Sequence, residues 1–142
     1  MSRPVMLTIR GEQRYHGQEP DVIELVTEGV LDSMPDGWRI TYAESGLTGM
    51  AGTQTTFEMQ PGSVVLARTG TVQSRMVFTE GVRHDSLYQL DVGALMVGVC
   101  AKKIHWEMTE DGGKLDVLYA VEIEQSLAGT VRYTIGVAPQ PV

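Results

Sequence analysis

Closely spaced turn signals divide this chain into short segments, and few of those segments have the periodicity of a helix. Residues 38–43 alternate apolar and polar side chains, which is the pattern of a strand with one buried face. Met34-Pro-Asp-Gly37 and Glu110-Asp-Gly-Gly113 have the residue order of tight turns. Because such signals recur about every 8–12 residues, the sequence predicts an all-β sandwich or barrel.

About ten strands are expected. Residues 21–31 could form a helix, because Glu24 and Glu28 are four apart, but their β-branched residues favour a long strand bent near Gly29. The segments with strand character are residues 5–10, 21–31, 38–43, 53–60, 64–69, 73–80, 83–90, 95–100, 104–108, 115–123 and 132–137.

Short connections make an up-and-down antiparallel meander the simplest topology, and closing it into a barrel removes its exposed edges. We therefore predict a single antiparallel up-and-down β-barrel over residues 1–142, with residues 138–142 as a frayed tail. The chain has no internal repeat or linker.

Composition narrows the classes of partner. The net charge of -7 argues against nucleic acid, which needs a basic footprint, and against an anionic membrane surface. No stretch approaches the ~20 apolar residues of a membrane span, and no basic-then-apolar leader opens the chain, so a cytoplasmic protein is expected. A small-molecule or protein partner fits best, and the sequence carries no signal for an oligomeric state.

Metal ligands and cofactor motifs are not apparent. The single Cys100 excludes an internal disulfide, and His16, His84 and His105 lack metal-site spacing. Residues 46–52 contain three glycines, but neither a dinucleotide fingerprint nor a P-loop, so these glycines are interpreted as conformational. We therefore expect no metal and no cofactor.

Several motifs resemble those of the YwiB-like family of bacterial proteins. They are Ile23-Glu-Leu-Val-Thr-Glu-Gly29, Glu44-Ser-Gly-Leu-Thr-Gly-Met-Ala-Gly-Thr53, residues 74–88 and Asp111-Gly-Gly-Lys-Leu115. The resemblance covers about residues 21–137, and it implies a calycin-type barrel, similar in shape to lipocalins, with no assigned biochemical function. The chain departs from the family pattern at Leu90-Asp91, where the family tends to have Thr-Pro, and at Ala101, where it has threonine.

Residues 74–90 carry the densest set of chemically capable side chains. If Glu80-Gly81 is a two-residue loop, Arg75 lies opposite Ser86. A bulge at Gly81 would shift this register by one residue. In the unshifted register, one face holds Arg75, Val77, His84, Ser86 and Tyr88.

That face would form a binding site if it pointed into the barrel. Arg75 offers a planar fork for a carboxylate or phosphate, His84 can exchange a proton near neutral pH, and Tyr88 adds a hydroxyl. A buried Arg75 needs a counter-charge, either Glu44 or an anionic ligand. The candidate ligand-binding residues are Arg75, His84, Tyr88, Ser86 and Glu44. Alternatively, an Arg75–Glu44 pair, or a solvent-facing Arg75, serves structure alone.

Three classes of function follow. The first is a non-enzymatic module that binds a small anionic or amphipathic molecule near Arg75, His84 and Tyr88. The second is an enzyme that uses His84 as general acid or base, with Arg75 and Tyr88 holding the substrate. The third is a structural or protein-interaction role. The binding module is preferred, because nothing around His84, Ser86 or Cys100 has the form of a catalytic motif.

Overall fold

Ten antiparallel strands form one sheet in the computed structural model, which describes residues 2–90 and 92–141. The elements are β1 (Ser2–Tyr15), β2 (Asp21–Met34), β3 (Gly37–Ala43), the 3-10 helix η1 (Gly46–Thr48), β4 (Thr53–Gln60), β5 (Ser63–Gly70), β6 (Ser74–Thr79), β7 (Arg83–Leu90), β8 (Gly93–Thr109), β9 (Gly112–Ile123) and β10 (Ser126–Pro139). The alternating segments and tight turns of the sequence therefore become strands and hairpins, as predicted.

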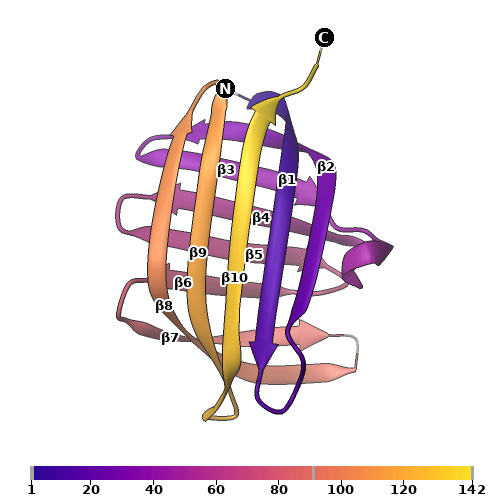
Figure 1. Cartoon of the computed structure of the whole chain (residues 1–142), viewed down its shortest axis with the longest axis vertical. Coiled ribbons are helices and arrows are strands. Elements are labelled where there is room, and N and C mark those ends of the chain that lie inside the picture. Colours follow the sequence, from indigo (N-terminus) through magenta and orange to yellow (C-terminus); the bar gives the residue numbers. More distant parts are fainter. Residues whose placement is uncertain (1, 91, 142) are drawn as a thin grey trace.

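The sheet curls into a nearly closed barrel. Its strand order is β6-β5-β4-β3-β2-β1-β10-β9-β8-β7, so strands that follow each other in sequence pair everywhere except between β6 and β7, and the first strand pairs with the last. In Figure 1 the long strands β8, β9, β10, β1 and β2 form the front wall, and β3 to β7 cross behind them. This is the predicted antiparallel barrel.

A seam between β6 and β7 interrupts the ring of strand pairing. The two strands are joined by isolated bridges, Gln73 with Gln89 at one end and Thr79 with Val82 at the other. The turn between them folds onto β8, where the Gly81 amide donates to the Ala101 carbonyl at 3.0 Å. The residues between the two bridges face each other without a continuous ladder.

One half of the barrel is filled by apolar side chains. This half, here called the packed half, holds the β2–β3, β4–β5 and β8–β9 turns. Its core residues include Val5, Leu7, Leu31, Met59, Val64, Phe78 and Leu115, each at most 1% exposed. In the β8–β9 turn, Gly112 has φ 110°, and a Cβ there would lie 2.2 Å from the Val137 carbonyl oxygen, which explains the glycine.

Several strand boundaries differ from the prediction. The first strand was expected over residues 5–10, but β1 continues to Tyr15, because β2 and β10 pair with it on both sides. Residues 95–100 and 104–108 were expected as two strands, but they form the single β8, with a register shift between Ala101 and Lys103. Ala138 and Pro139 were expected in the frayed tail, but they extend β10 beside β1.

Candidate functional site

The opposite half of the barrel, here called the hollow half, contains a cavity of about 260 Å³, here called the main cavity. It lies toward the β1–β2 and β9–β10 turns. A side cavity of about 60 Å³ adjoins it and shares Gln13, Met50, Val131 and Tyr133 with it. The other residues around the main cavity are Tyr15, Arg68, Met76, Tyr88, Leu95, Val97, Tyr119, Val121 and Ile123. Most of these side chains are apolar or aromatic, and Arg68 is the charged member.

Arg68 reaches the interior because of the register of the β4–β5 hairpin. Gln60 pairs with Ser63 across the two-residue Pro61-Gly62 turn, so Thr55 lies opposite Arg68. Side chains of β5 alternate, and Arg68 continues the inward series of Val64 and Leu66. Arg68 is 5% exposed, which is rare for an arginine without a counter-charge.

The guanidinium of Arg68 has few partners. Its Nη2 donates to the Tyr133 hydroxyl at 3.0 Å, and its Nε has no hydrogen-bond acceptor. Among the ion pairs found in residues 2–90 and 92–141, none brings a carboxylate within 4.0 Å of Arg68. Since a guanidinium carries five N–H donors, most of its donor capacity is unused.

Neighbouring tyrosines do not neutralise this charge. Burial raises the pKa of Tyr42 and of Tyr119 well above that of a free phenol, so both stay protonated at neutral pH. Burial lowers the pKa of Arg68, yet the net shift of that pKa is upward. Because an arginine guanidinium stays protonated in proteins, Arg68 is a permanent buried cation.

Ser74 lies beside Arg68. The two are Cα partners on β6 and β5, and the Ser74 side chain is buried with an Oγ that has no hydrogen-bond partner. The Gln73–Gln89 bridge brings the adjacent Tyr88 of β7 to the same level of the wall. Ser74 is not among the residues that line the main cavity, so the charged donor that this part of the wall offers to an anion is Arg68.

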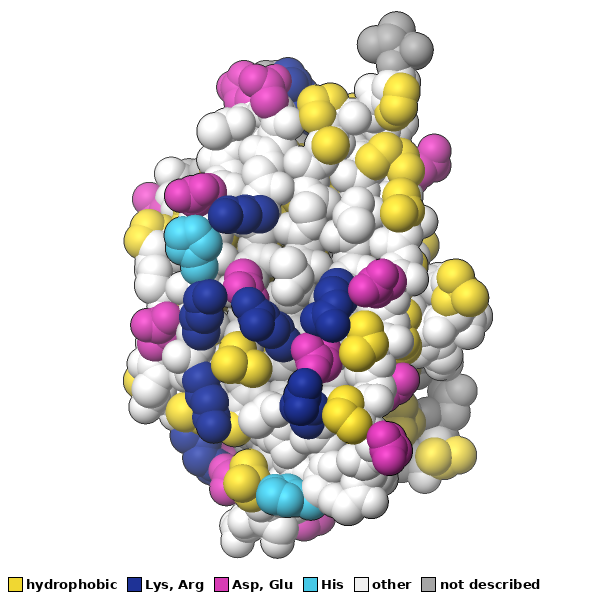
Figure 2. Space-filling view, in the orientation of Figure 1, with side chains coloured by type: hydrophobic (Ala, Val, Ile, Leu, Met, Phe, Trp, Pro, Cys, Tyr) yellow, Lys and Arg dark blue, Asp and Glu magenta, His cyan; other side chains and the backbone are white. Residues whose placement is uncertain are grey.

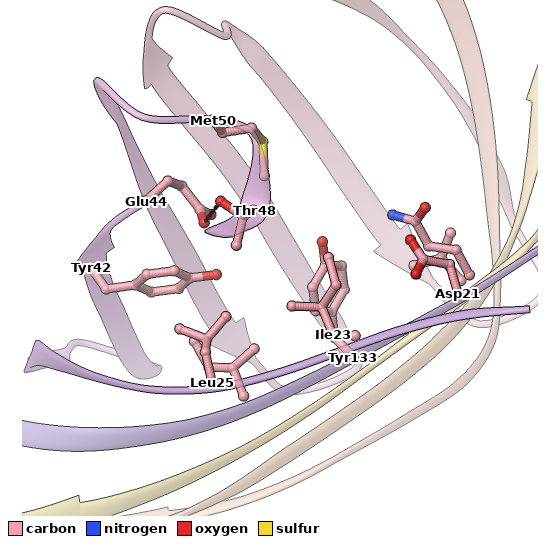
Figure 3. Close-up of a pocket in the computed structure, with 12 residues that line it drawn as sticks. Asp21, Ile23, Leu25, Tyr42, Glu44, Thr48, Met50 and Tyr133 are labelled. Carbon is pink, nitrogen blue, oxygen red and sulfur yellow. Dashed lines mark hydrogen bonds between the residues drawn. The ribbon is translucent and has the colours of Figure 1, made fainter. Parts of the chain in front are cut away.

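Glu44 introduces the opposite charge in the side cavity. It follows β3, is 8% exposed, and accepts hydrogen bonds from Thr48 at 2.9 Å and from Thr55 at 2.5 Å. Figure 3 shows its carboxylate beside Thr48, with the Tyr42 ring below them and Met50 above. Within the described residues, no cationic side chain lies within ion-pair distance of Glu44.

Arg75 does not take the inward position that the candidate site required, and the solvent-facing alternative is the one found. Arg75 is exposed on the outer face of β6, between buried Ser74 and Met76. The turn has the expected register, with Thr79 opposite Val82, but Gln73 lies opposite Gln89, one residue out of step. A shift of one residue moves a side chain to the other face, so neither the Arg75 site nor the Arg75–Glu44 pair forms.

His84, Ser86 and Tyr88 do point inward from β7, as predicted, but they are separated along the strand. Tyr88 lines the main cavity. His84 lies level with Val99, and its buried Nε2 has no partner; the Ser86 Oγ is likewise unpartnered. Neither residue lines the main cavity. The structure therefore does not bring His84 together with Arg75 and Tyr88 in one site.

A signal for Arg68 was present in the sequence. Thr55 and Phe57 alternate with polar Gln54 and Glu58, which marks the inward face of β4, and the Pro61-Gly62 turn fixes the partner strand. Carrying that register across the turn places Arg68 on the inward face. The apolar residues on both faces of β5 concealed this position.

The outer wall carries most of the other cations. Figure 2 shows Lys and Arg gathered over the front wall and interleaved with acidic side chains. Glu12 forms ion pairs with Arg10 and Arg14, and Asp116 pairs with Arg132 at 2.7 Å. These cations are matched by carboxylates, in contrast to Arg68.

The structure describes residues 2–90 and 92–141. Asp91, one of the positions at which the sequence departs from the family pattern, lies outside these residues, as do Met1 and Val142. Within the described part of the chain, no helix has the length and apolar character needed to cross a membrane. Over the same residues, no group of three or more His, Cys, Asp or Glu side chains is placed to hold a metal ion.

Fold and interior together define an antiparallel β-barrel with a charged internal cavity. The model of a family described as "Domain of unknown function (DUF1934)" matches residues 7–135, and the chain belongs to this family. The crystal structure of the ywiB protein from Bacillus subtilis is similar to it in fold, with a TM-score of 0.87 and 20% sequence identity over 99% of this chain and 94% of that one. The predicted YwiB-like resemblance is thereby confirmed. No protein with a curated description matches the chain.

Proposed function

We propose that this protein binds a small amphipathic carboxylate inside the hollow half of the barrel. The observation that carries the proposal is Arg68, a permanent cation that is 5% exposed and has one hydrogen bond, to Tyr133. A buried charge without a partner is costly, and a bound anion would offset that cost. The role first assigned to Arg75 passes to Arg68.

Charge balance favours a carboxylate over a phosphate. Arg68 is the charged residue around the main cavity, and the neighbouring side cavity adds the carboxylates of buried Glu44 and exposed Asp21. A single guanidinium balances a single negative charge. A phosphate dianion would keep an excess negative charge close to these anions. The Arg68 guanidinium is a suitable donor for a carboxylate.

The rest of the main cavity suits an apolar chain. Met50, Met76, Leu95 and Val97 contribute to its walls, and methionine side chains adapt to ligands of irregular shape. A volume of about 260 Å³ is close to the lower end of ligand pockets, which begin near ~300 Å³, so the ligand is small. The resemblance to calycin-type barrels supports the same proposal, because a barrel of about eight strands can hold one small ligand.

Titration calorimetry with short alkanoates tests the proposal. Hexanoate should bind with a Kd in the micromolar-to-millimolar range, while hexanol and methyl hexanoate, which lack the charge, should bind at least about tenfold more weakly. Arg68→Met should abolish hexanoate binding. Arg75→Met, which removes an exposed cation from the neighbouring strand, should leave it unchanged.

Two outcomes would overturn the proposal. One is that alkanoates from butanoate to decanoate all fail to bind or to raise the melting temperature of the folded protein. The other is that Arg68→Met binds hexanoate as well as the unmodified protein does, since the anion would then sit elsewhere. Circular dichroism of each variant shows whether the barrel is intact.

A further inference from the structure

A second buried charge adjoins the proposed carboxylate site and has no part in it. Glu44 is 8% exposed, close to the 5% of Arg68, and it accepts hydrogen bonds from the hydroxyls of Thr48 and Thr55, with the Tyr42 hydroxyl as a further hydrogen-bond partner. A carboxylate has about four lone-pair positions, so these hydroxyls leave part of its acceptor capacity unoccupied. Glu44 thus resembles Arg68 with the sign reversed: a buried ion without a counter-ion in the described part of the chain.

The fold holds these two charges apart. Thr55 lies between them, because its Oγ1 donates to Glu44 while its Cα is the cross-strand partner of Arg68. The guanidinium and the carboxylate therefore line adjoining cavities without an ion pair within 4.0 Å. Direct pairing would be the simplest way to reduce the cost of burying both. A structure that separates them leaves room for a ligand with two charges.

The side cavity is suited to an ammonium group. It is lined by the Glu44 carboxylate, the Thr48 hydroxyl and the Tyr42 and Tyr133 rings, with apolar Leu25 opposite (Figure 3). Carboxylate and hydroxyl oxygens accept hydrogen bonds from an ammonium, and tyrosine rings attract a cation through their faces. Tyr133 lines both cavities and accepts the hydrogen bond of Arg68, so the two sites meet at its hydroxyl.

From this geometry we infer that the ligand is a small zwitterion: its carboxylate binds at Arg68, its ammonium binds at Glu44, and an apolar spacer passes Met50 and Tyr133. Aliphatic amino acids and their ω-amino homologues belong to this class. The inference rests on the proposed carboxylate site and adds the second charge to it. Ligand and protein charges then cancel in pairs inside the barrel.

Matched probes separate this inference from the proposed function. Calorimetry on the unmodified protein compares each straight-chain alkanoate with the ω-aminoalkanoate of the same length, from propanoate to octanoate, and with hexylamine. At least one aminoalkanoate should bind about tenfold or more tightly than its alkanoate, because it gains a charge-assisted contact. Hexylamine, which lacks the carboxylate, should bind more weakly than either.

Substitutions test whether Glu44 causes the tighter binding of an aminoalkanoate than of its alkanoate, here called the gain. Glu44→Gln keeps the side-chain shape and an acceptor for a threonine hydroxyl, and it should remove the gain while leaving alkanoate affinity within about twofold. Glu28→Gln, an exposed carboxylate on β2, is the control and should change neither affinity. Thr48→Val removes the hydroxyl acceptor beside Glu44 and should reduce the gain, which supplies a second variant if Glu44→Gln unfolds.

The possible failures are distinguishable. If alkanoates bind through Arg68 but no aminoalkanoate binds more tightly than its alkanoate, the zwitterion inference is wrong and the proposed function stands. If Glu44→Gln retains the full gain, Glu44 is not the ammonium site. If no alkanoate and no aminoalkanoate binds, both proposals are wrong.

Discussion

The packed half and the hollow half of this barrel are built from the same ten strands, yet they differ in the side chains that those strands direct into the interior. In the packed half, inward positions are occupied by residues such as Leu31, Met59 and Leu115, which are at most 1% exposed. In the hollow half, the same alternation delivers Arg68 and Glu44. The packed half has the apolar interior of a stable core, whereas the hollow half buries two charged side chains that have no ion-pair partner among the described residues.

This difference teaches where to look for function. Natural sequences are consistent across levels except where function requires a departure, and the buried charged side chains of the described residues, Glu44 and Arg68, lie at one end of the interior. Stability and binding should therefore respond to substitutions in different halves of the molecule. Three predictions, in order of decreasing effect, test that division.

Leu115→Ala in the packed half should have the largest effect. Leu115 is 0% exposed, so the substitution leaves a void, and we expect the free energy of unfolding to fall by about 2–5 kcal/mol. Leu95→Ala removes the same atoms from the wall of the main cavity, where the side chain is 40% exposed, and should cost less than about 1 kcal/mol. Urea denaturation of both variants measures the contrast, and equal losses would remove the distinction between the halves.

Arg68→Met in the hollow half should act in the opposite direction. Replacing a buried unpaired cation with an apolar side chain of similar length should raise the free energy of unfolding of the ligand-free protein by about 1–4 kcal/mol. Arg75→Met, on the exposed face, should change it by less than about 0.5 kcal/mol. A clear loss of stability in Arg68→Met would mean that Arg68 supports the fold rather than a ligand.

A substitution on the outer wall should have the smallest effect on the free energy of unfolding, and that effect should depend on pH. Hydrogen bonds from Arg132 lower the pKa of Asp116 below 3.8; burial opposes this shift, and Lys103 adds to it. Because the folded-state pKa is depressed, the stabilisation is complete above the unfolded pKa and is lost as the pH falls through the folded pKa. Asp116→Asn should therefore cost up to about 1 kcal/mol at pH 7 and nothing below about pH 2. Thermal melts of Asp116→Asn and the unmodified protein across this pH range measure the difference in stability. A difference that did not change with pH would contradict the prediction.

Much of the fold was predictable from local signals. Strand segments and tight turns are encoded within a few residues of each other, so β3, β4 and the β8–β9 turn were found from alternation and turn chemistry. The merging of residues 95–100 and 104–108 into β8 was not, because strand continuity there depends on pairing with β9 across a register shift. Tertiary pairing, rather than local preference, also sets the length of β1.

The candidate site was predicted only in part. Glu44 and Tyr88 were selected from the sequence, and both line the cavities. Arg75 was selected because the face of a strand residue depends on register, and the β6–β7 register slips by one residue between its two bridges. Arg68 was missed because apolar residues on both faces of β5 concealed its inward position. Whether a buried charge has a counter-ion depends on the whole barrel, and no local sequence pattern predicts it.

The pairing of β1 with β10 also has a consequence for how the chain is made. Translation delivers β1 to β6 and then β7 to β9 before β10, and β10 is the strand that joins these two groups into one sheet. Until residues 126–139 leave the ribosome, β1 and β9 each present a long unpaired edge. Closure of the sheet therefore waits for β10 and depends on the contact of greatest sequence separation, and the nascent chain must avoid edge-to-edge association until then.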